Sequence, residues 1–170
     1  MGGTLCGQSD PPLNALGREQ ADSLAQSFRG SSVRRVYASN LQRAVQTAQP
    51  IAELLGLPLT LRTELGEIGF GEWEGKRWSQ IRAENPEIAA IESSPERVAP
   101  GGESFGRFRE RVTRVLNEIL TESGGQPAAI ITHLGVIRFL LSELVGAKEL
   151  WEPERRIEYC AVFQLQLPGS

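Results

Sequence analysis

Apolar residues recur along this chain with two alternating periods, and the alternation predicts the order of its helices and strands. Short apolar runs are typical of buried strands, whereas apolar positions three and four residues apart are typical of helices packed on one face. Strands are predicted at residues 33–38, 57–61, 127–132 and 157–167. Helices are predicted after the capping residue Asn14, from Leu41 to Leu55, at residues 78–84, after the capping residue Ser104, and at residues 134–141. Residues 62–75 and 93–103, rich in glycine, glutamate or proline, are predicted loops.

The order of these elements indicates an α/β fold. Strands that alternate with helices form a mainly parallel sheet covered by helices on both faces, which is a three-layer αβα architecture. The chain has 170 residues, of which 40% are hydrophobic, enough to bury one core. We therefore expect a single domain over residues 1–170.

Composition excludes several classes of partner. The formal net charge of −3 provides no general basic field, so nucleic acid is not an expected ligand. No apolar run approaches the roughly 18 residues of a membrane span, and the start of the chain has no signal-peptide pattern. Cys6 and Cys160 lie far apart without metal-ligand spacing, as expected for reduced thiols in a cytoplasmic protein. Neither a metal nor another cofactor is predicted.

His133 is the only histidine of the chain, and its position is informative. It directly follows the strand predicted at residues 127–132 and precedes the helix predicted at 134–141. Open α/β sheets build ligand sites at the carboxyl ends of their strands, and the amide groups at a helix start favour an anion. Taken alone, a single histidine is more often structural than catalytic, so its neighbours in the sequence decide the interpretation.

Four segments occur in one order along the chain. They are residues 7–17, 38–48 and 65–75, and then 100–104 together with 132–138. In this order they closely resemble the histidine phosphatase superfamily, the phosphoglycerate mutase-like proteins, from about Cys6 to Leu141. The resemblance implies phosphoryl transfer through a phosphohistidine. In that chemistry one histidine attacks phosphorus, a second histidine and two arginines hold the phosphate oxygens, and a carboxyl group protonates the leaving oxygen.

The resemblance assigns three principal residues. Arg43 matches the second phosphate-binding arginine, and its planar fork suits phosphate oxygens; without the surrounding motif it would be read as a solvated helix residue. Glu67 matches the general acid, whose pKa is expected to rise by burial beside Ile68, Phe70 and Trp73. Surface roles are expected for the nearby Glu64, Glu72 and Glu74. His133 matches the second histidine, a phosphate ligand and not the nucleophile.

Further positions of the implied site are less distinctive. Leu134 stands where the family usually has glycine, and Gly135 is retained, so both are assigned to the phosphate-binding loop. Cys6 and Gly7 fall where related proteins contact substrate, although Cys6 is equally well explained as a small buried residue. The turn at residues 101–104 is expected at the rim of the site. The implied partner is a small phosphorylated substrate.

One part of the family pattern is not found. Family members begin with an apolar strand ending in Arg-His-Gly, whereas this chain begins Met1-Gly2-Gly3-Thr4-Leu5. The nucleophilic histidine is therefore absent, and the chain as given is predicted to be inactive. Either the chain starts at an internal methionine or it is a genuine pseudo-phosphatase; the retention of Arg43, Glu67 and His133 favours the first explanation. The gap left by the first strand is expected to be filled by the chain's own N-terminal residues, by a strand from a partner chain as in a homodimer, or by closure of the sheet.

The predicted function is thus a phosphoric monoester hydrolase of the histidine phosphatase type, acting through a phosphohistidine in its complete form. Alternatives are a phosphoglycerate mutase-type phosphotransferase, a non-catalytic protein that binds a phosphate ligand, and an unrelated α/β interaction domain. Only about 30 residues separate Glu67 from Pro100, which suits a compact phosphatase better than a mutase with inserted loops. The start of the matching region is similar to α-ribazole phosphatase-like members. The sequence does not identify the substrate.

Overall fold

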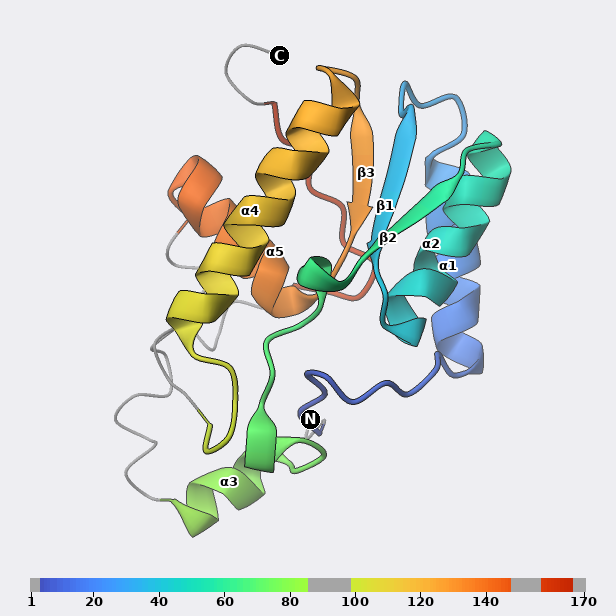
Figure 1. Ribbon diagram of the computed structural model, residues 1–170. Coiled ribbons are helices and arrows are strands. Elements are labelled where there is room, and N and C mark those ends of the chain that lie inside the picture. Colours follow the sequence, from blue (N-terminus) through green and yellow to red (C-terminus); the bar gives the residue numbers. More distant parts are fainter. Residues whose placement is uncertain (1–3, 86–98, 148–156, 167–170) are drawn as a thin grey trace.

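The centre of the molecule is a parallel β-sheet. The computed structural model describes residues 4–85, 99–147 and 157–166, and in this part of the chain three strands form the sheet (Figure 1). They are β1 (Arg35–Ser39), β2 (Leu59–Arg62) and β3 (Ala128–Ile131), in the spatial order β2-β1-β3. Val36 of β1 lies opposite Leu59 of β2 and Ala129 of β3, and both pairings are parallel. The predicted α/β class with a parallel sheet is confirmed.

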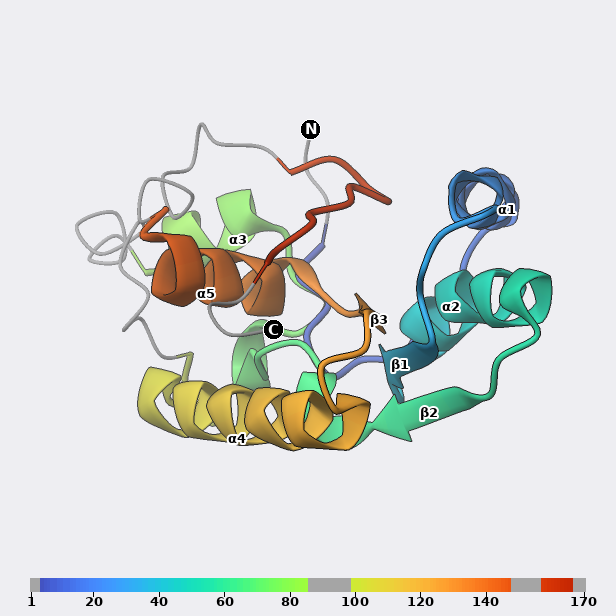
Figure 2. The same ribbon diagram turned by 90° about the horizontal axis from the view of Figure 1, so that it is seen from above.

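Helices cover both faces of this sheet. Helix α1 (Ala15–Ser27) packs on α2 (Gln42–Leu55), and α2 in turn lies on the sheet (Figure 2). The opposite face is covered by α4 (Phe105–Ser123), which packs against α5 (Leu134–Val145). The short helix α3 (Trp78–Glu84) lies apart from the sheet, near the N-terminal segment (Figure 1).

Side-chain alternation along β1 explains the layers. Val36 and Ala38 point to one face and pack with Ala48 and Ala52 of α2. Tyr37 points to the other face and packs with α4 residues, among them Val115 and Ile119. Successive side chains of a strand point to opposite faces, so β1 is buried on both sides as the central strand of the described sheet.

The predicted capping residues are confirmed. The Asn14 side chain accepts a hydrogen bond of 2.8 Å from the amide of Gly17 at the start of α1, and the Ser104 hydroxyl accepts one of 3.3 Å from the amide of Arg107 at the start of α4. Helix α5 continues past the predicted Leu141 to Val145 and ends at Gly146, which has a φ of 73°. Among the helices of the described ranges, none is long and apolar enough to cross a membrane.

Two sequence predictions need correction. The predicted loop at 62–75 contains two 3-10 helices, η1 (Thr63–Leu65) and η2 (Gly71–Trp73), and its first residue closes β2. The strand predicted at 157–167 is wrong for residues 157–166, which contain no strand, while residue 167 lies outside the described residues. A strand needs a hydrogen-bonded neighbour, and the described residues give this segment none; Val162 and Phe163 remain 60% and 44% exposed. Of the loop predicted at 93–103, residues 93–98 lie outside the described residues.

The N-terminal segment pairs away from the sheet. The amide of Leu5 donates to the carbonyl of Lys76, the amide of Gly75 donates to the carbonyl of Leu5, and Thr4 forms a bridge with Arg77. Within the described residues, β3 has a strand partner only on its β1 side. The chain's own N-terminal residues were one expected filler of the gap left by the first strand, but residues 4 and 5 do not pair with β3.

Candidate active site

Three of the predicted site residues follow the carboxyl ends of the strands. Arg43 lies in the first turn of α2, after β1. Glu67 follows η1, which itself follows β2. His133 is the N-terminal capping residue of α5, after β3. Because all three strands are parallel, these positions meet at one edge of the sheet, which is where α/β folds place ligands.

Glu67 is a buried carboxyl group with two main-chain donors. Its side chain is held by the amide of Gly135, 3.0 Å from Oε2, and by the amide of Ile68, 2.9 Å from Oε1. Burial raises the pKa of Glu67, against the opposing effect of these two hydrogen bonds and of the charges of Arg43 and Arg111. The raised pKa has the expected direction and favours the protonated form that a general acid needs.

The apolar surroundings of Glu67 differ in part from the expectation. Ile68 packs against the cluster formed by α4 and α5 residues. Phe70 and Trp73 instead belong to a separate cluster with Ile81 of α3. The contact that buries the carboxyl of Glu67 from across the fold is with α5, since a Cβ placed on Gly135 would lie 2.3 Å from Oε1.

His133 is buried and holds a neutral ring. Its residue is 8% exposed, and its buried Nε2 atom has no hydrogen-bond partner among the described residues. Burial lowers the pKa of His133 to about 3, and the charges of Arg43 and Arg111 act in the same direction, against the effect of Asp10. A neutral imidazole whose ring nitrogen is unpartnered within this part of the chain can serve a ligand as a hydrogen-bonding group.

Arg43 holds the N-terminal segment. Its Nη1 atom donates to the carbonyl of Ser9 at 2.8 Å, and its Nη2 atom donates to the carbonyls of Gly7 at 2.8 Å and Cys6 at 3.2 Å. These bonds use three of the five N–H donors of the guanidinium. Arg43 thereby joins residues 6–9 to α2 at the edge of the sheet where Glu67 and His133 lie.

The other predicted site residues have mixed surroundings. A Cβ on Gly7 would lie 2.2 Å from the carbonyl oxygen of Ile68, so close packing alone accounts for glycine there. Cys6 is partly buried, with its Sγ atom 3.9 Å from the hydroxyl of Thr4. Leu134 is 42% exposed in the first turn of α5. The amide of Gly135 is directed to Glu67.

Glu74 was misjudged as a surface residue. Its carboxylate accepts hydrogen bonds from the amides of Gly7, Gln8, Ser9 and Phe70 and from the hydroxyl of Ser9, at 2.8–3.3 Å. Burial opposes its ionisation, but these bonds outweigh burial and lower its pKa. Glu74 therefore anchors residues 7–9, which are also held by Arg43. Nothing local to the Trp-Glu-Gly sequence distinguishes it from the exposed Glu72, because its partners are up to 67 residues away.

Sequence reasoning missed Arg111 of α4, which donates to the carbonyl of Glu67. It placed the turn at residues 101–104 at the rim of the site but gave Glu103 no role. The Glu103 carboxylate pairs with Arg111 and accepts from the amide of Gly69. As for metals, no group of three or more His, Cys, Asp or Glu side chains is placed to hold an ion within residues 4–85, 99–147 and 157–166. The groups that this edge offers for chemistry are the guanidinium groups of Arg43 and Arg111, the neutral ring of His133 and the buried carboxyl group of Glu67.

Comparison with known proteins gives matches over most of the chain. The sequence profile of the histidine phosphatase superfamily (branch 1) matches residues 1–169. The chain is 31% identical over 153 residues to the adenosylcobalamin/alpha-ribazole phosphatase of Escherichia coli (strain K12), covering 88% of this chain and 75% of that relative. It is 27% identical to a probable phosphoglycerate mutase of Salmonella choleraesuis (strain SC-B67), and the match covers 96% of this chain and 77% of that relative. The solved structure of a mycobacterial glucosyl-3-phosphoglycerate phosphatase superposes with a TM-score of 0.77 at 27% identity, covering 87% of this chain and 74% of that one.

Proposed function

Because this chain belongs to the histidine phosphatase superfamily, we propose that the edge formed by Arg43, Glu67 and His133 binds the phosphoryl group of a small phosphate monoester. In this proposal Arg43 and His133 are phosphate ligands and Glu67 is the general acid. The observation that carries it is the buried Nε2 atom of His133, which has no hydrogen-bond partner in the described part of the chain.

The charges at this edge suit that ligand. His133 is held neutral at physiological pH, so it can donate a ring N–H to a phosphate oxygen while Arg43 supplies the positive charge. The guanidinium of Arg43 is oriented by three carbonyls and has donor capacity beyond those bonds. Positive groups fixed in advance stabilise the charge that spreads over the equatorial oxygens in phosphoryl transfer.

Glu67 supplies the proton. When a histidine nitrogen attacks phosphorus, the bond from phosphorus to the leaving oxygen breaks and that oxygen needs a proton. The raised pKa of Glu67 favours its protonated form, which can supply this proton. The resulting carboxylate can then remove a proton from the water that hydrolyses the phosphohistidine.

The nucleophile is the one group of this chemistry that these residues do not supply. The 170 residues contain a single histidine, and His133 stands in the ligand position of the motif. A second histidine from outside these residues would have to attack phosphorus. We therefore propose that these 170 residues bind phosphate without steady turnover, and that hydrolysis requires a second histidine. A hydrolase is favoured over a mutase by the short span between Glu67 and Pro100.

The test measures binding and turnover separately. Phosphate should shift the ring nitrogen NMR signals of His133, and Arg43→Ala should weaken phosphate binding at least about tenfold. Arg35→Ala is the matched control, since Arg35 is exposed at the start of β1. Hydrolysis of p-nitrophenyl phosphate should not exceed that of His133→Ala. If the parent shows steady turnover and His133→Ala abolishes it, His133 is the nucleophile. If phosphate does not shift the ring nitrogen signals of His133, this histidine is not part of the phosphate site.

A further inference from the structure

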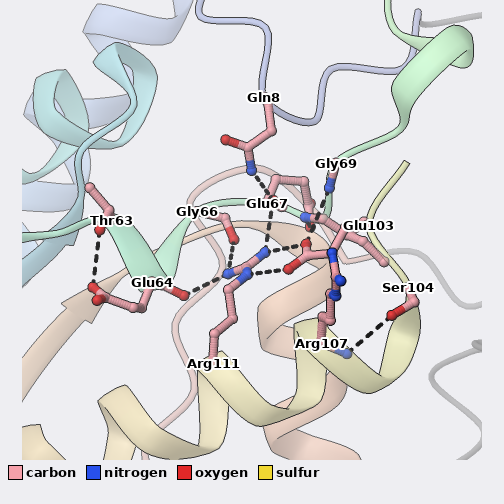
Figure 3. A network of polar contacts seen from close by, with 11 residues as sticks. Gln8, Thr63, Glu64, Gly66, Glu67, Gly69, Glu103, Ser104, Arg107 and Arg111 are labelled. Atoms are coloured by element: carbon pink, nitrogen blue, oxygen red, sulfur yellow. Dashed lines mark hydrogen bonds and ion pairs between the residues drawn. The ribbon is translucent and has the colours of Figure 1, made fainter. Parts of the chain in front are cut away.

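Arg111 of α4 is the centre of a network of polar contacts around the main chain that carries Glu67 (Figure 3). Its guanidinium forms a two-pronged ion pair with Glu103. The distances are 2.6 Å from Nε to Oε1 and 2.7 Å from Nη2 to Oε2. Parallel bonds of this kind fix the plane of the guanidinium as well as its position.

The same guanidinium also donates hydrogen bonds to main-chain carbonyls of Glu67 and of the residues before it. Nη1 donates to the carbonyls of Glu64 at 2.6 Å and Gly66 at 2.8 Å, and Nη2 donates to the carbonyl of Glu67 at 3.0 Å. Together with the two bonds to Glu103, these contacts use all five N–H donors of the arginine. A lysine offers three donors from a single point and cannot reproduce this arrangement.

The network is anchored at both ends. The guanidinium lies over the ring of Phe108, 4.9 Å from its centroid, and Phe108 is fully buried between α4 and α5. Glu103 is tied to the chain beyond Glu67, because its Oε2 accepts from the amide of Gly69 at 3.3 Å and its own amide donates to the carbonyl of Gly69 at 2.9 Å. The two ionic side chains are only 17% and 18% exposed. Arg111 and Glu103 thus hold the backbone on both sides of Glu67.

We propose that Arg111, oriented by Glu103, is the positioning residue for Glu67, which it holds with its carboxyl group against Gly135 of α5. The proposal rests on the proposed function, in which Glu67 is the general acid. Proton transfer to a leaving oxygen requires that the carboxyl be placed to within about 0.5 Å. Because Arg111 touches only the main chain of Glu67, it acts through the position of that residue and not by contact with a ligand.

The experiment follows the Glu67 carboxyl in the chain as it exists. Carbon-13 NMR of labelled glutamate, with Glu67→Gln for assignment, measures the pKa of Glu67 in the parent and in Arg111→Lys. The matched control is Arg109→Lys, at an exposed position of the same helix. The charged groups that act on Glu67 are Arg43, Arg111 and Arg138, and the neighbouring His133 is neutral. All of these charges are retained in Arg111→Lys, so a change reports position.

We expect the pKa of Glu67 to fall by roughly one pH unit in Arg111→Lys, because a released backbone lets water reach the carboxyl. The control should leave it unchanged. An unchanged pKa in a folded Arg111→Lys variant overturns the positioning role. A parent pKa at the ordinary value of a glutamate would instead refute Glu67 as the general acid, so the two failures are distinguishable.

A second variant covers the case in which Arg111→Lys does not fold. Glu103→Gln keeps Arg111 but removes its ion pair, and hydrogen exchange reads the result at the amides of Ile68 and Gly135, which the Glu67 carboxyl protects. We expect both amides to exchange about tenfold faster, while amides in the middle of α4 are unaffected. Equal exchange rates in Glu103→Gln and the parent would overturn the proposal.

Discussion

Gly135→Ala tests the close contact between α5 and the carboxyl group of Glu67. A Cβ at this position would lie 2.3 Å from Oε1 of Glu67 and 3.2 Å from its Cδ. An ordinary contact needs about 3.4 Å or more, so the carboxyl must move by about 1 Å. The 3.0 Å bond from the Gly135 amide to Oε2 would then lengthen to about 4 Å, which is no longer a hydrogen bond.

The magnitude follows from two opposing effects. Breaking a bond to a buried carboxyl costs about 1–3 kcal/mol. Replacing glycine by alanine within a helix gains up to about 1 kcal/mol. We expect Gly135→Ala to lower the free energy of unfolding by roughly 0–3 kcal/mol. Gly106→Ala is the matched control, because Gly106 is likewise the second residue of its helix and a Cβ there meets nothing within 4 Å. That variant should be stabilised by up to about 1 kcal/mol.

Urea denaturation at pH 7 measures both variants, and a double-mutant cycle identifies the cause. In a Glu67→Ala background the added methyl group has no carboxyl to displace, so Gly135→Ala should become as favourable as Gly106→Ala. If Gly135→Ala stabilises the parent as much as Gly106→Ala does, the Glu67 carboxyl does not lie against α5 and the reasoning fails.

Two further predictions concern pH and backbone conformation. The pKa of His133 is about 3 when folded and near 6.5 when unfolded, so the unfolded state binds more protons between these values. The contribution of His133 to stability is therefore present above pH 6.5 and is lost as pH falls toward 3. His133→Gln should make the free energy of unfolding, measured by urea denaturation, depend less on pH between 3 and 6.5. If NMR shows the His133 ring of the folded parent titrating near pH 6.5, the prediction is wrong. Gly71 has a φ of 47°, and a Cβ there would lie 2.3 Å from the carbonyl oxygen of Pro100, whereas Gly75 has a φ of 74° and open space. Gly71→Ala should thus lower the melting temperature more than Gly75→Ala, which bears only the strain of about 1–2 kcal/mol; equal losses would show that the contact with Pro100 is not tight.

Local patterns in the sequence determined most of the fold. The apolar periods predicted the helices and the three described strands to within a few residues, and Asn14 and Ser104 cap helices as expected. These features depend on neighbours three or four residues apart, which the sequence displays directly. Arg43, Glu67 and His133 were found because their segments resemble a known family, and the parallel order of the strands then brings them to one edge.

Tertiary structure decided how those residues are held. Glu74 binds the amides of residues 7–9, Arg111 binds carbonyls 44–47 residues away, and Glu67 meets Gly135 at a separation of 68. The contacts of Arg111 and Gly135 depend on how α4 and α5 pack beside the sheet, and no local period encodes any of these contacts. The strand prediction at 157–167 was wrong for residues 157–166 because it also depended on tertiary structure. Its alternating apolar residues satisfy a local pattern, but a strand forms only where another strand offers hydrogen bonds, and in the described residues none does.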